Sequence, residues 1–168
     1  FPSESRPTPL TTRLMSEEHR QLLFRLDTES TTPLNDAERA SIRGYIETML
    51  GEVDVMVLCD SQKGTFGSPV FDRWLVDTAA QRGVKSIVLS RPPGLGSFAG
   101  ASVIISSAAN AREFMYLRGR GFPTDLRGAG QEMRELLHCS SLVVIYEAGG
   151  LSEWSADGDS PFFPGPAI

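Results

Sequence analysis

Two short stretches carry polar residues at spacings that suit phosphate binding. The stretch "CDSQKG" (59–64) places Asp60 and Lys63 directly after an apolar run and follows them with Gly64. An ammonium group on a flexible stem binds phosphate as a point charge, and a glycine lets the backbone approach a ligand closely. The alternative is a solvated turn with a weak local Asp–Lys pair. Asp60, Lys63 and Gly64 are therefore candidate substrate-binding residues.

The stretch "SSAANAREFM" (106–115) contains the second candidate pair, Asn110 and Glu113. This spacing predicts that Asn110 is the N-cap of a helix and that Glu113 completes a capping box. A helix N-terminus also binds anions, so the same residues can hold a phosphate and its metal. Both functions stay open at this point, because they are compatible.

The sequence shows no residue pattern typical of nucleophilic catalysis or of a zinc site. His19 and His138 do not neighbour a serine or cysteine in a nucleophile setting, and no G-x-S-x-G motif is present. Cys59 and Cys139 lack the spacing of a zinc site, so we expect two buried free thiols and no metal site of this kind.

A further hypothesis makes the chain an unrelated α/β enzyme that uses Asp60 as a nucleophile or metal ligand. It requires a second acidic residue on a neighbouring loop, and Asp157 and Asp159 are the candidates.

Length and composition limit the class of protein. A chain of 168 residues with 40% hydrophobic and 22% charged residues predicts one globular domain, 1–168. The net charge of −5 disfavours a nucleic-acid partner, and no apolar run reaches the roughly 18 residues of a membrane helix. The opening "FPSESRPTPL" has no secretory signal pattern and reads as part of a longer polypeptide, which we expect to be cytoplasmic.

Hydrophobic periodicity predicts the elements that position these residues. We expect a hairpin within 10–29, an α/β core over 34–154 and an extended tail over 155–168 that has no closing element. Within the core, a strand, helix and strand over 53–89 form a βαβ unit with parallel strands. Further segments continue the pattern: a helix at 34–51, strands at 101–106, 141–146 and 149–154, and helices at 110–117 and 124–140.

Capping signals and apolar spacing refine two of these helices. Asn35 with Glu38 predicts a capping box, and Ile42, Tyr45, Ile46 and Met49 are expected to face inward. The next helix is expected to begin with Ser68 as cap and Pro69 at its first position, and Phe71, Trp74, Leu75 and Thr78 are expected to share one face.

In an open parallel sheet, ligands bind at the carboxyl ends of the strands. We therefore expect the chemistry in the loops "CDSQKGTFG", "SRPPGLGS", "SSAANARE" and "EAGG", the second of which is expected to be irregular.

Taken in order, these segments resemble the ribokinase-like (PfkB-type) sugar kinases. The resemblance is strongest to the heptose-phosphate kinase domain of bifunctional ADP-heptose synthesis enzymes. "RPTPLTTR" (6–13) is similar to that family's RPTTxKTR, and "RQLLFRLDTE" (20–29) to its QQLxRLDxE. "CDSQKG" is similar to DYxKG, and the Gly-Ala strand that leads to Asn110 and Glu113 is similar to the segment before PNxxE.

The resemblance implies a three-layer sandwich with a mainly parallel sheet and an N-terminal β-hairpin. It implies ATP-dependent phosphorylation of a sugar phosphate, with Asp60, Lys63 and Gly64 at the sugar phosphate and Asn110 and Glu113 at Mg²⁺–ATP. It also implies a possible homodimer formed through the hairpin.

Several departures lead us to expect that this chain alone is inactive, as in a pseudokinase. The family's DPKG is "RPPG" here, so Arg91 stands in place of the Asp and Pro93 in place of the Lys. Glu147 adds an anion where phosphates would sit. The family's Gly-Ala-Gly-Asp motif, which carries the catalytic base, is expected after Ile168, so no catalytic residue is assigned. The alternative is a non-catalytic, kinase-derived binding or oligomerisation module.

Overall fold

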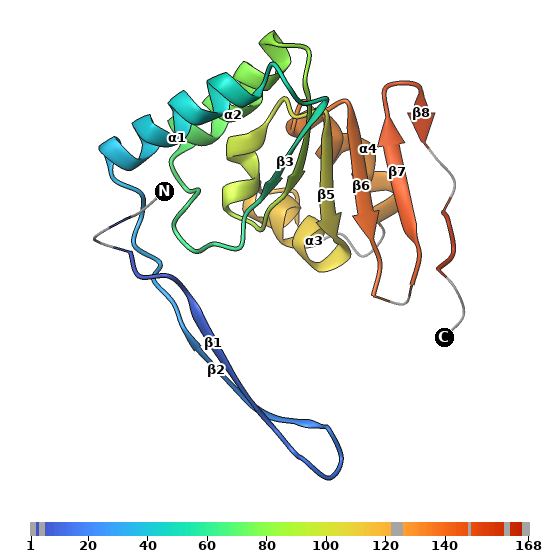
Figure 1. Ribbon diagram of the computed structural model, residues 1–168. Coiled ribbons are helices and arrows are strands. Elements are labelled where there is room, and N and C mark those ends of the chain that lie inside the picture. The colour runs from blue at the N-terminus through green and yellow to red at the C-terminus, as the bar shows by residue number, and fades with distance from the viewer. Residues whose placement is uncertain (1–2, 4–5, 122–125, 148, 160–161, 166–168) are drawn as a thin grey trace.

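The computed structural model describes residues 3, 6–121, 126–147, 149–159 and 162–165. Within them, a two-stranded antiparallel hairpin of β1 (Leu10–Met15) and β2 (Leu22–Thr28) projects from an α/β body (Figure 1). The hairpin predicted from the sequence is thus confirmed. Every residue of both strands is exposed, so the hairpin has no described layer packed on either face.

A six-stranded sheet in the order β3-β4-β5-β6-β7-β8 forms the centre of the body. The first four strands pair in parallel and the last two antiparallel, which confirms the predicted parallel sheet and return strand. The strands are β3 (Val55–Cys59), β4 (Lys85–Leu89), β5 (Val103–Ser107), β6 (Ser141–Ile145), β7 (Leu151–Ser155) and β8 (Gly158–Asp159).

Helix α1 (Asp36–Met49) begins with the predicted capping box. The Asn35 side chain accepts from the Glu38 N–H at 2.9 Å, and Glu38 accepts from the Asn35 N–H at 2.8 Å. Ile42 and Ile46 pack against the core as expected. Tyr45 was predicted to face inward, but it is 55% exposed because the apolar stripe of this helix is narrower than the sequence pattern suggests.

Helix α2 (Pro69–Gln81) starts at Pro69 as predicted, and Phe71 and Leu75 are buried. Ser68 is the N-cap residue as predicted, although its side chain makes no cap hydrogen bond. The loop "SRPPGLGS" after β4 was expected to be irregular, but it contains the 3₁₀ helix η1 (Gly94–Phe98), in which Leu95 and Phe98 are buried.

Helix α3 (Ala108–Leu117) begins two residues earlier than predicted, and this changes its cap. Ser107 is the N-cap, and its side chain accepts from the Asn110 N–H at 3.2 Å. The prediction that Asn110 caps the helix is therefore wrong: Asn110 lies inside the first turn. Glu113, one turn further on, is exposed and completes no capping box.

Helix α4 (Leu126–Leu136) packs on β6 and β7 and buries Met133. Gly130 weakens this helix locally, but close packing explains why a glycine stands there. A side-chain carbon at that position would collide with the indole of Trp154.

Helices cover one face of this sheet. One cross-strand row on that face, from Leu58 through Val88, Ile104 and Leu142 to Trp154, is at most 5% exposed throughout. It forms one cluster with buried residues of α2, α3 and α4, and Ile46 of α1 packs on the same side. The described residues therefore supply the sheet and one helix layer of the three-layer sandwich that the resemblance implies.

Two sequence expectations need correction at the periphery. The tail does carry closing elements, since β8 pairs with β7 and Phe163 bridges to Leu151. Both cysteines are free, but only Cys139 is buried, because Cys59 ends the edge strand β3 and is exposed.

Candidate functional site

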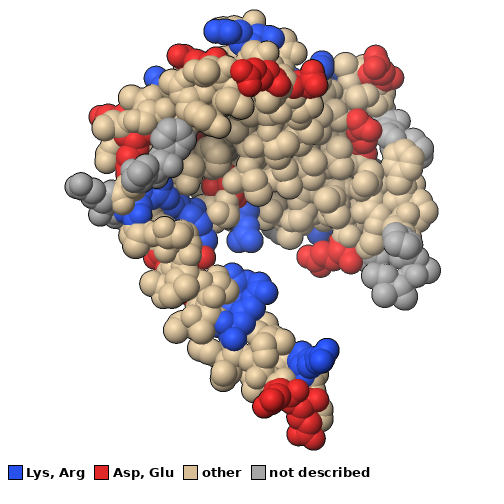
Figure 2. Space-filling model, in the orientation of Figure 1, with Lys and Arg blue, Asp and Glu red and all other residues tan. Residues whose placement is uncertain are grey.

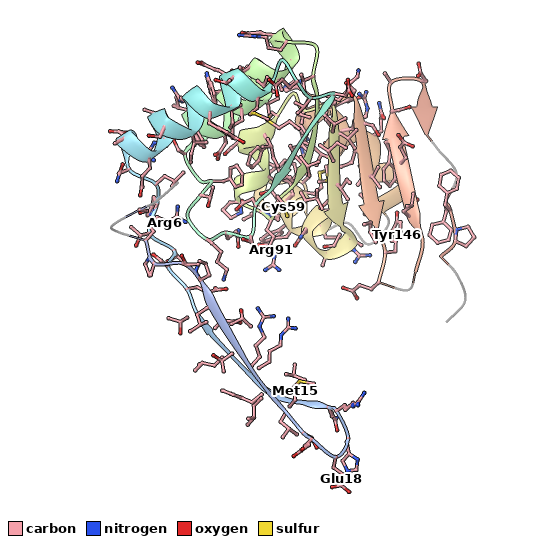
Figure 3. The ribbon with its side chains drawn as sticks, in the orientation of Figure 1. Arg6, Met15, Glu18, Cys59, Arg91 and Tyr146 are labelled. Carbon is pink, nitrogen blue, oxygen red and sulfur yellow. The ribbon has the colours of Figure 1, made fainter. Side chains whose placement is uncertain are left out.

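The carboxyl ends of β3 to β6 meet at one edge of the sheet, as the parallel topology requires. A hollow of about 370 Å³, the strand-end hollow, opens there. Figure 3 places Cys59 and Arg91 close to this edge. The hollow is lined by Cys59, Asp60, Ser61, Leu89, Ser90, Arg91, Ile105, Ser106, Ser107, Asn110 and Ile145.

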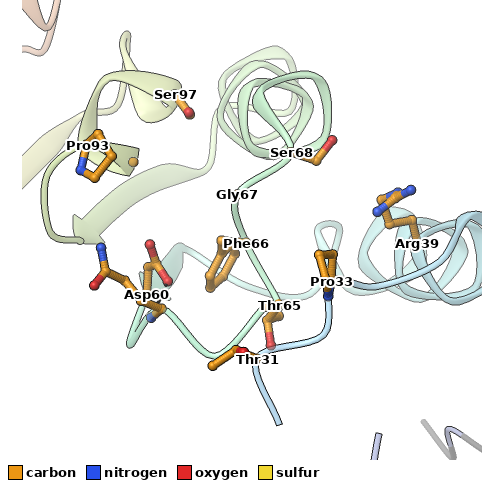
Figure 4. Close-up of a pocket in the computed structure, with 13 residues that line it drawn as sticks. Thr31, Pro33, Arg39, Asp60, Thr65, Phe66, Gly67, Ser68, Pro93 and Ser97 are labelled. Carbon is orange, nitrogen blue, oxygen red and sulfur yellow. Dashed lines mark hydrogen bonds between the residues drawn. The ribbon is translucent and has the colours of Figure 1, made fainter. Parts of the chain in front are cut away.

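A second hollow of about 470 Å³, the loop hollow, lies between the β3–α2 loop, η1 and the segment before α1 (Figure 4). Asp60 lines both hollows and thus stands at their junction. The lining residues are Thr31, Pro33, Arg39, Asp60, Gln62, Gly64, Thr65, Phe66, Gly67, Ser68, Pro93, Gly94 and Ser97.

Asp60 is held rigidly by its neighbours. Its N–H donates to the Leu89 carbonyl at 2.8 Å, which continues the β3–β4 pairing past the strand end. One carboxylate oxygen accepts from the Ser90 hydroxyl at 2.9 Å and the other from the Gln62 N–H at 2.7 Å. A carboxylate fixed in this way can orient a ligand hydroxyl with its remaining lone pairs.

Lys63 does not pair with Asp60, so the simple Asp–Lys turn considered from the sequence is not formed. Its ammonium instead pairs with Glu29 at the base of the hairpin. Arg6 donates to the Lys63 carbonyl at 2.6 Å, which ties this turn to the segment before the hairpin.

The Lys63 side chain lines a third hollow of about 470 Å³, the hairpin-base hollow. This hollow and the loop hollow share Thr65. Its lining residues are Ser3, Arg6, Pro7, Thr8, Pro9, Ser30, Leu34, Glu38, Ile42, Ser61, Lys63 and Thr65.

Gly64 has a backbone role that the sequence signal did not specify. Its φ is +79°, and a side-chain carbon there would collide with the carbonyl groups of Thr31 and Thr32. The Gly64 carbonyl accepts from the Leu34 N–H at 3.1 Å. The glycine therefore lets the loop pack against the segment that leads from the hairpin into α1.

The structure places the two residues of the second candidate pair, Asn110 and Glu113, in different surroundings. Asn110 lines the strand-end hollow together with Asp60 and Arg91. Glu113 is exposed on α3 and does not line that hollow. Glu147 is likewise exposed and does not line that hollow, and its repulsion of ligand phosphates stays a prediction.

Asp72, in the first turn of α2, is a buried acid that sequence reasoning missed, and it accepts from Gly67, which lines the loop hollow. Its side chain is fully buried, and one oxygen accepts from the Gly67 N–H at 3.0 Å while the other has no partner. Burial, with a smaller contribution from the charge of Asp60, raises its pKa to about 6. An acidic residue among the apolar residues of the α2 inner face was the only available signal.

The described residues contain no group of three His, Cys, Asp or Glu side chains suited to a metal ion. Mg²⁺ commonly uses one or two protein oxygens together with substrate phosphates, and Asp60 and Asn110 share one hollow in a way that fits this pattern. The alternative hypothesis of an unrelated enzyme needs a second acidic residue beside Asp60. Asp157 does not supply it, because it lies in the β7–β8 turn and lines none of the three hollows. The side chain of Asp159 lies outside the described residues.

Among the described helices, none is long and apolar enough to span a bilayer.

Similarity to solved structures defines the class of fold. The tetrameric inhibited form of phosphofructokinase-2 from Escherichia coli matches 94% of this chain with a TM-score of 0.73 and 16% identity. A structure described as a possible 1-phosphofructokinase from Thermotoga maritima matches 94% with a TM-score of 0.62 and 18% identity. The chain spans 51% and 48% of those proteins. The fold is therefore ribokinase-like.

Sequence similarity identifies relatives of this chain more specifically than the fold does. The bifunctional protein HldE of Paramagnetospirillum magneticum is 29% identical over 164 residues, which are 96% of this chain. That of Gluconacetobacter diazotrophicus is 33% identical over 121 residues, or 72% of the chain. The chain spans 32% and 24% of these relatives, and no protein-family model matches it. It is a divergent relative of the PfkB-type sugar kinases and is homologous to part of the bifunctional HldE proteins, which confirms the resemblance read from the sequence.

Proposed function

We propose that this chain supplies part of the binding site for a sugar phosphate and Mg²⁺–ATP in a kinase of the heptose-phosphate type. The observation that carries the proposal is Asp60, which lies at the junction of the loop and strand-end hollows in a chain homologous to HldE over 96% of its length. A sugar in one hollow and a nucleotide in the other would bring the hydroxyl and the phosphate together near this carboxylate.

On the sugar side, Asp60 orients a hydroxyl in the loop hollow, and Lys63 neutralises the sugar's phosphate from the hairpin-base hollow, which shares Thr65 with the loop hollow. Lys63 pairs with Glu29 in the free protein, and the two side chains are 39% and 24% exposed. A partly exposed ion pair contributes at most about 1 kcal/mol, so a phosphate dianion can displace the Glu29 carboxylate. Gly64 serves by keeping the loop closed against Thr31 and Thr32.

On the nucleotide side, Asn110 and the first turn of α3 face the strand-end hollow. A helix N-terminus stabilises negative charge, and Arg91 on the same rim adds a cation. Mg²⁺ bound there would neutralise phosphate charge, with Asn110 as an oxygen ligand. Glu113 would then act from the exposed side of α3, through a water molecule.

We also propose that the 168-residue chain does not turn over by itself. Phosphoryl transfer depends on positioning and charge neutralisation, together with a base for the attacking hydroxyl. Among the lining residues of the loop and strand-end hollows, Asp60 is the only carboxylate, and hydrogen bonds from Ser90 and Gln62 stabilise its charged form. We assign Asp60 to orienting the hydroxyl, so no second carboxylate among these lining residues is left to act as the base.

The test combines calorimetry with an assay of ATP-dependent phosphorylation, using heptose and hexose phosphates. We expect sugar-phosphate binding that Lys63→Ala weakens by at least about tenfold, with no phosphorylated product. Lys85→Ala, which removes a cation at the opposite end of the sheet, is the matched control and should not change the affinity. Turnover that Lys63→Ala abolishes would sink the claim of inactivity. Equal affinity of the two variants would sink the assignment of Lys63.

A second function, assembly through the hairpin, has its own observation. Seven apolar side chains of β1 and β2 are between 48% and 61% exposed, and a two-stranded hairpin is marginally stable alone. We propose that the hairpin pairs with that of a second copy. Phe24→Asp should then convert a dimer into a monomer in light scattering, whereas Arg13→Asp, a charge change in the opposite strand, should perturb it less. A wild-type chain that is strictly monomeric would contradict this proposal.

A further inference from the structure

One wall of the loop hollow is formed by the second half of the β3–α2 loop (60–68), as Figure 4 shows. The residues of this half that line the hollow are Thr65, Phe66, Gly67 and Ser68. Among the described residues, the Gly67 N–H makes the only hydrogen bond of a backbone group within 65–67, and its acceptor is Asp72 of α2 at 3.0 Å. The hydrogen bond between Gly67 and Asp72 is therefore the main backbone tie between this wall and the body of the protein.

Asp72 acts where the side-chain cap of α2 is missing. Ser68 is the N-cap residue of the helix, but its side chain makes no cap hydrogen bond. Asp72, in the first turn, reaches back past Ser68 to the Gly67 N–H. Gly67 is exposed and has a φ of +108°, and a side-chain carbon there would have open space around it. The hydrogen bond, rather than side-chain packing, thus holds Gly67 against α2.

The charged form of Asp72 is poorly compensated while the loop is closed. Its side chain is fully buried, and its second carboxyl oxygen has no hydrogen-bond partner. A buried carboxylate requires partners for its charge, and a single N–H supplies little of what water would. Burial, with a smaller contribution from the charge of Asp60, raises the pKa of Asp72 to about 6. The closed loop therefore favours the protonated form.

No cation among the described residues pairs with Asp72. Lys63 and Arg73 each pair with another carboxylate, and Arg43 lies 4.9 Å from the centre of the Trp74 ring. The 3₁₀ helix η1 has no charged side chain. The charged side chains on the other elements around Asp72 are Asp60 and Lys63 on the loop, Asp36, Glu38, Arg39, Arg43 and Glu47 on α1, Arg73 and Asp77 on α2, and Lys85 on β4. Loss of the Asp72 proton thus leaves an unpaired charge behind the loop.

We propose that Asp72 is a positioning residue for the β3–α2 loop: its neutral form holds Gly67 and keeps this wall of the loop hollow closed, and its charged form lets the wall open. Opening admits water to the carboxylate and removes the cost of burying its charge. The wall therefore tightens as the pH falls toward 5 and loosens as it rises toward 7. The effect on a bound sugar rests on the proposed function, but the opening itself requires no ligand.

Hydrogen exchange of the Gly67 amide, followed by NMR on the free 168-residue chain, measures this opening. The pKa of Asp72 is about 6 in the closed loop, and in the open loop we expect the ordinary 3.8, so the closed loop binds more protons between these values. Its population relative to the open loop then falls as the pH rises. After correction for the intrinsic exchange rate, the protection of Gly67 should be roughly tenfold higher at pH 5 than at pH 7. Amides of β4 and β5 should exchange far more slowly, because the loop opens without unfolding the sheet.

Two variants of similar shape separate the charge from the hydrogen bond. Asp72→Asn keeps an acceptor but cannot ionise, so the protection of Gly67 should be the same at both pH values. Asp72→Leu removes the acceptor, so protection at pH 5 should fall at least about fivefold below that of the unaltered chain and should not depend on pH. Asp77→Asn is the matched control, because it removes a half-exposed acid of the same helix. It should retain the tenfold change.

Protection of Gly67 that does not depend on pH in the unaltered chain would overturn the proposal, as would the same tenfold change in Asp72→Asn. Exchange of Gly67 at the rate of the β4 and β5 amides would also overturn it, since the loop would then open only when the whole domain unfolds. A purely structural role of Asp72 would lower protection in Asp72→Leu without producing the pH dependence. No sugar or nucleotide is present, so failure of this inference is distinguishable from failure of the proposed function.

Discussion

At the scale of residues, Asp60 and Asp72 are two acidic side chains that lie near each other but differ in burial and in hydrogen bonding. Asp60 sits at the junction of two hollows with both oxygens hydrogen-bonded. Asp72 is fully buried, holds the Gly67 N–H and leaves one oxygen without a partner. Its buried charge is therefore a source of instability that the protein retains beside the loop carrying Asp60 and Lys63.

The first prediction concerns the pH dependence that Asp72 causes. Its pKa is about 6 in the folded state, against 3.8 for an unperturbed aspartic acid, so the folded state binds more protons between these values. Stability should therefore fall as the pH rises from about 4 to 6, by up to about 3 kcal/mol. Asp72→Asn should flatten this dependence in urea unfolding at pH 4.5 and 7. Asp77→Asn, which removes a half-exposed acid of the same helix that pairs with Arg73, should retain most of it. An unchanged slope in Asp72→Asn would refute the assignment.

The second prediction compares two glycines. Gly64→Ala should destabilise the protein by about 2 kcal/mol or more, because of its positive φ and the collision with the Thr31 and Thr32 carbonyl groups. Gly44→Ala, in α1 with open space around it, should stabilise by roughly 0.5 to 1 kcal/mol. Free energies of unfolding from urea titrations measure both. A neutral Gly64→Ala would contradict the close packing of this loop.

At the scale of elements, the hairpin and the central sheet differ in the interactions that stabilise them. Figure 2 shows the hairpin standing apart from the body. The hairpin has cross-strand pairing, with Thr11 and Arg25 both donating to Asp27 and lowering its pKa, but no described layer over its apolar side chains. The strands β4 and β5 lie inside the sheet with one face buried under helices.

The third prediction is a contrast in hydrogen exchange. Amide protons of β1 and β2 should exchange at least about a hundredfold faster than those of β4 and β5, because the hairpin opens without unfolding the body. Mass spectrometry on peptides from both regions measures this. Equal protection at low protein concentration would show that another surface already covers the hairpin.

The elements were largely predictable from the sequence, and the errors have physical causes. The strong signals were the Asn35–Glu38 capping box, Pro69 at a helix start and the apolar strand runs, and each was confirmed. The cap of α3 was misplaced because Ser107 and Asn110 are both good caps, and only the length of β5 decides between them. The ion pair between Lys63 and Glu29 and the burial of Asp72 depend on tertiary contacts between distant segments, which local patterns do not encode.

At the scale of the whole molecule, the described residues form the sheet and one helix layer of a ribokinase-like fold. The strand-end hollow opens at the carboxyl ends of the parallel strands, and three of its apolar lining residues, Leu89, Ile105 and Ile145, are partly or largely exposed. We infer that the residues gathered here bind ligands weakly on their own.

The most direct test of this account is an NMR titration of the 168-residue chain with Mg²⁺–ATP and, separately, with a heptose phosphate. We predict that ATP shifts the amide signals of Ser106, Ser107 and Asn110 at the strand-end hollow. The sugar phosphate should shift those of Gln62, Lys63 and Gly64 beside the loop hollow. Shifts confined to the hairpin, with none at the strand ends, would contradict the proposal that this chain supplies part of a binding site for a sugar phosphate and Mg²⁺–ATP.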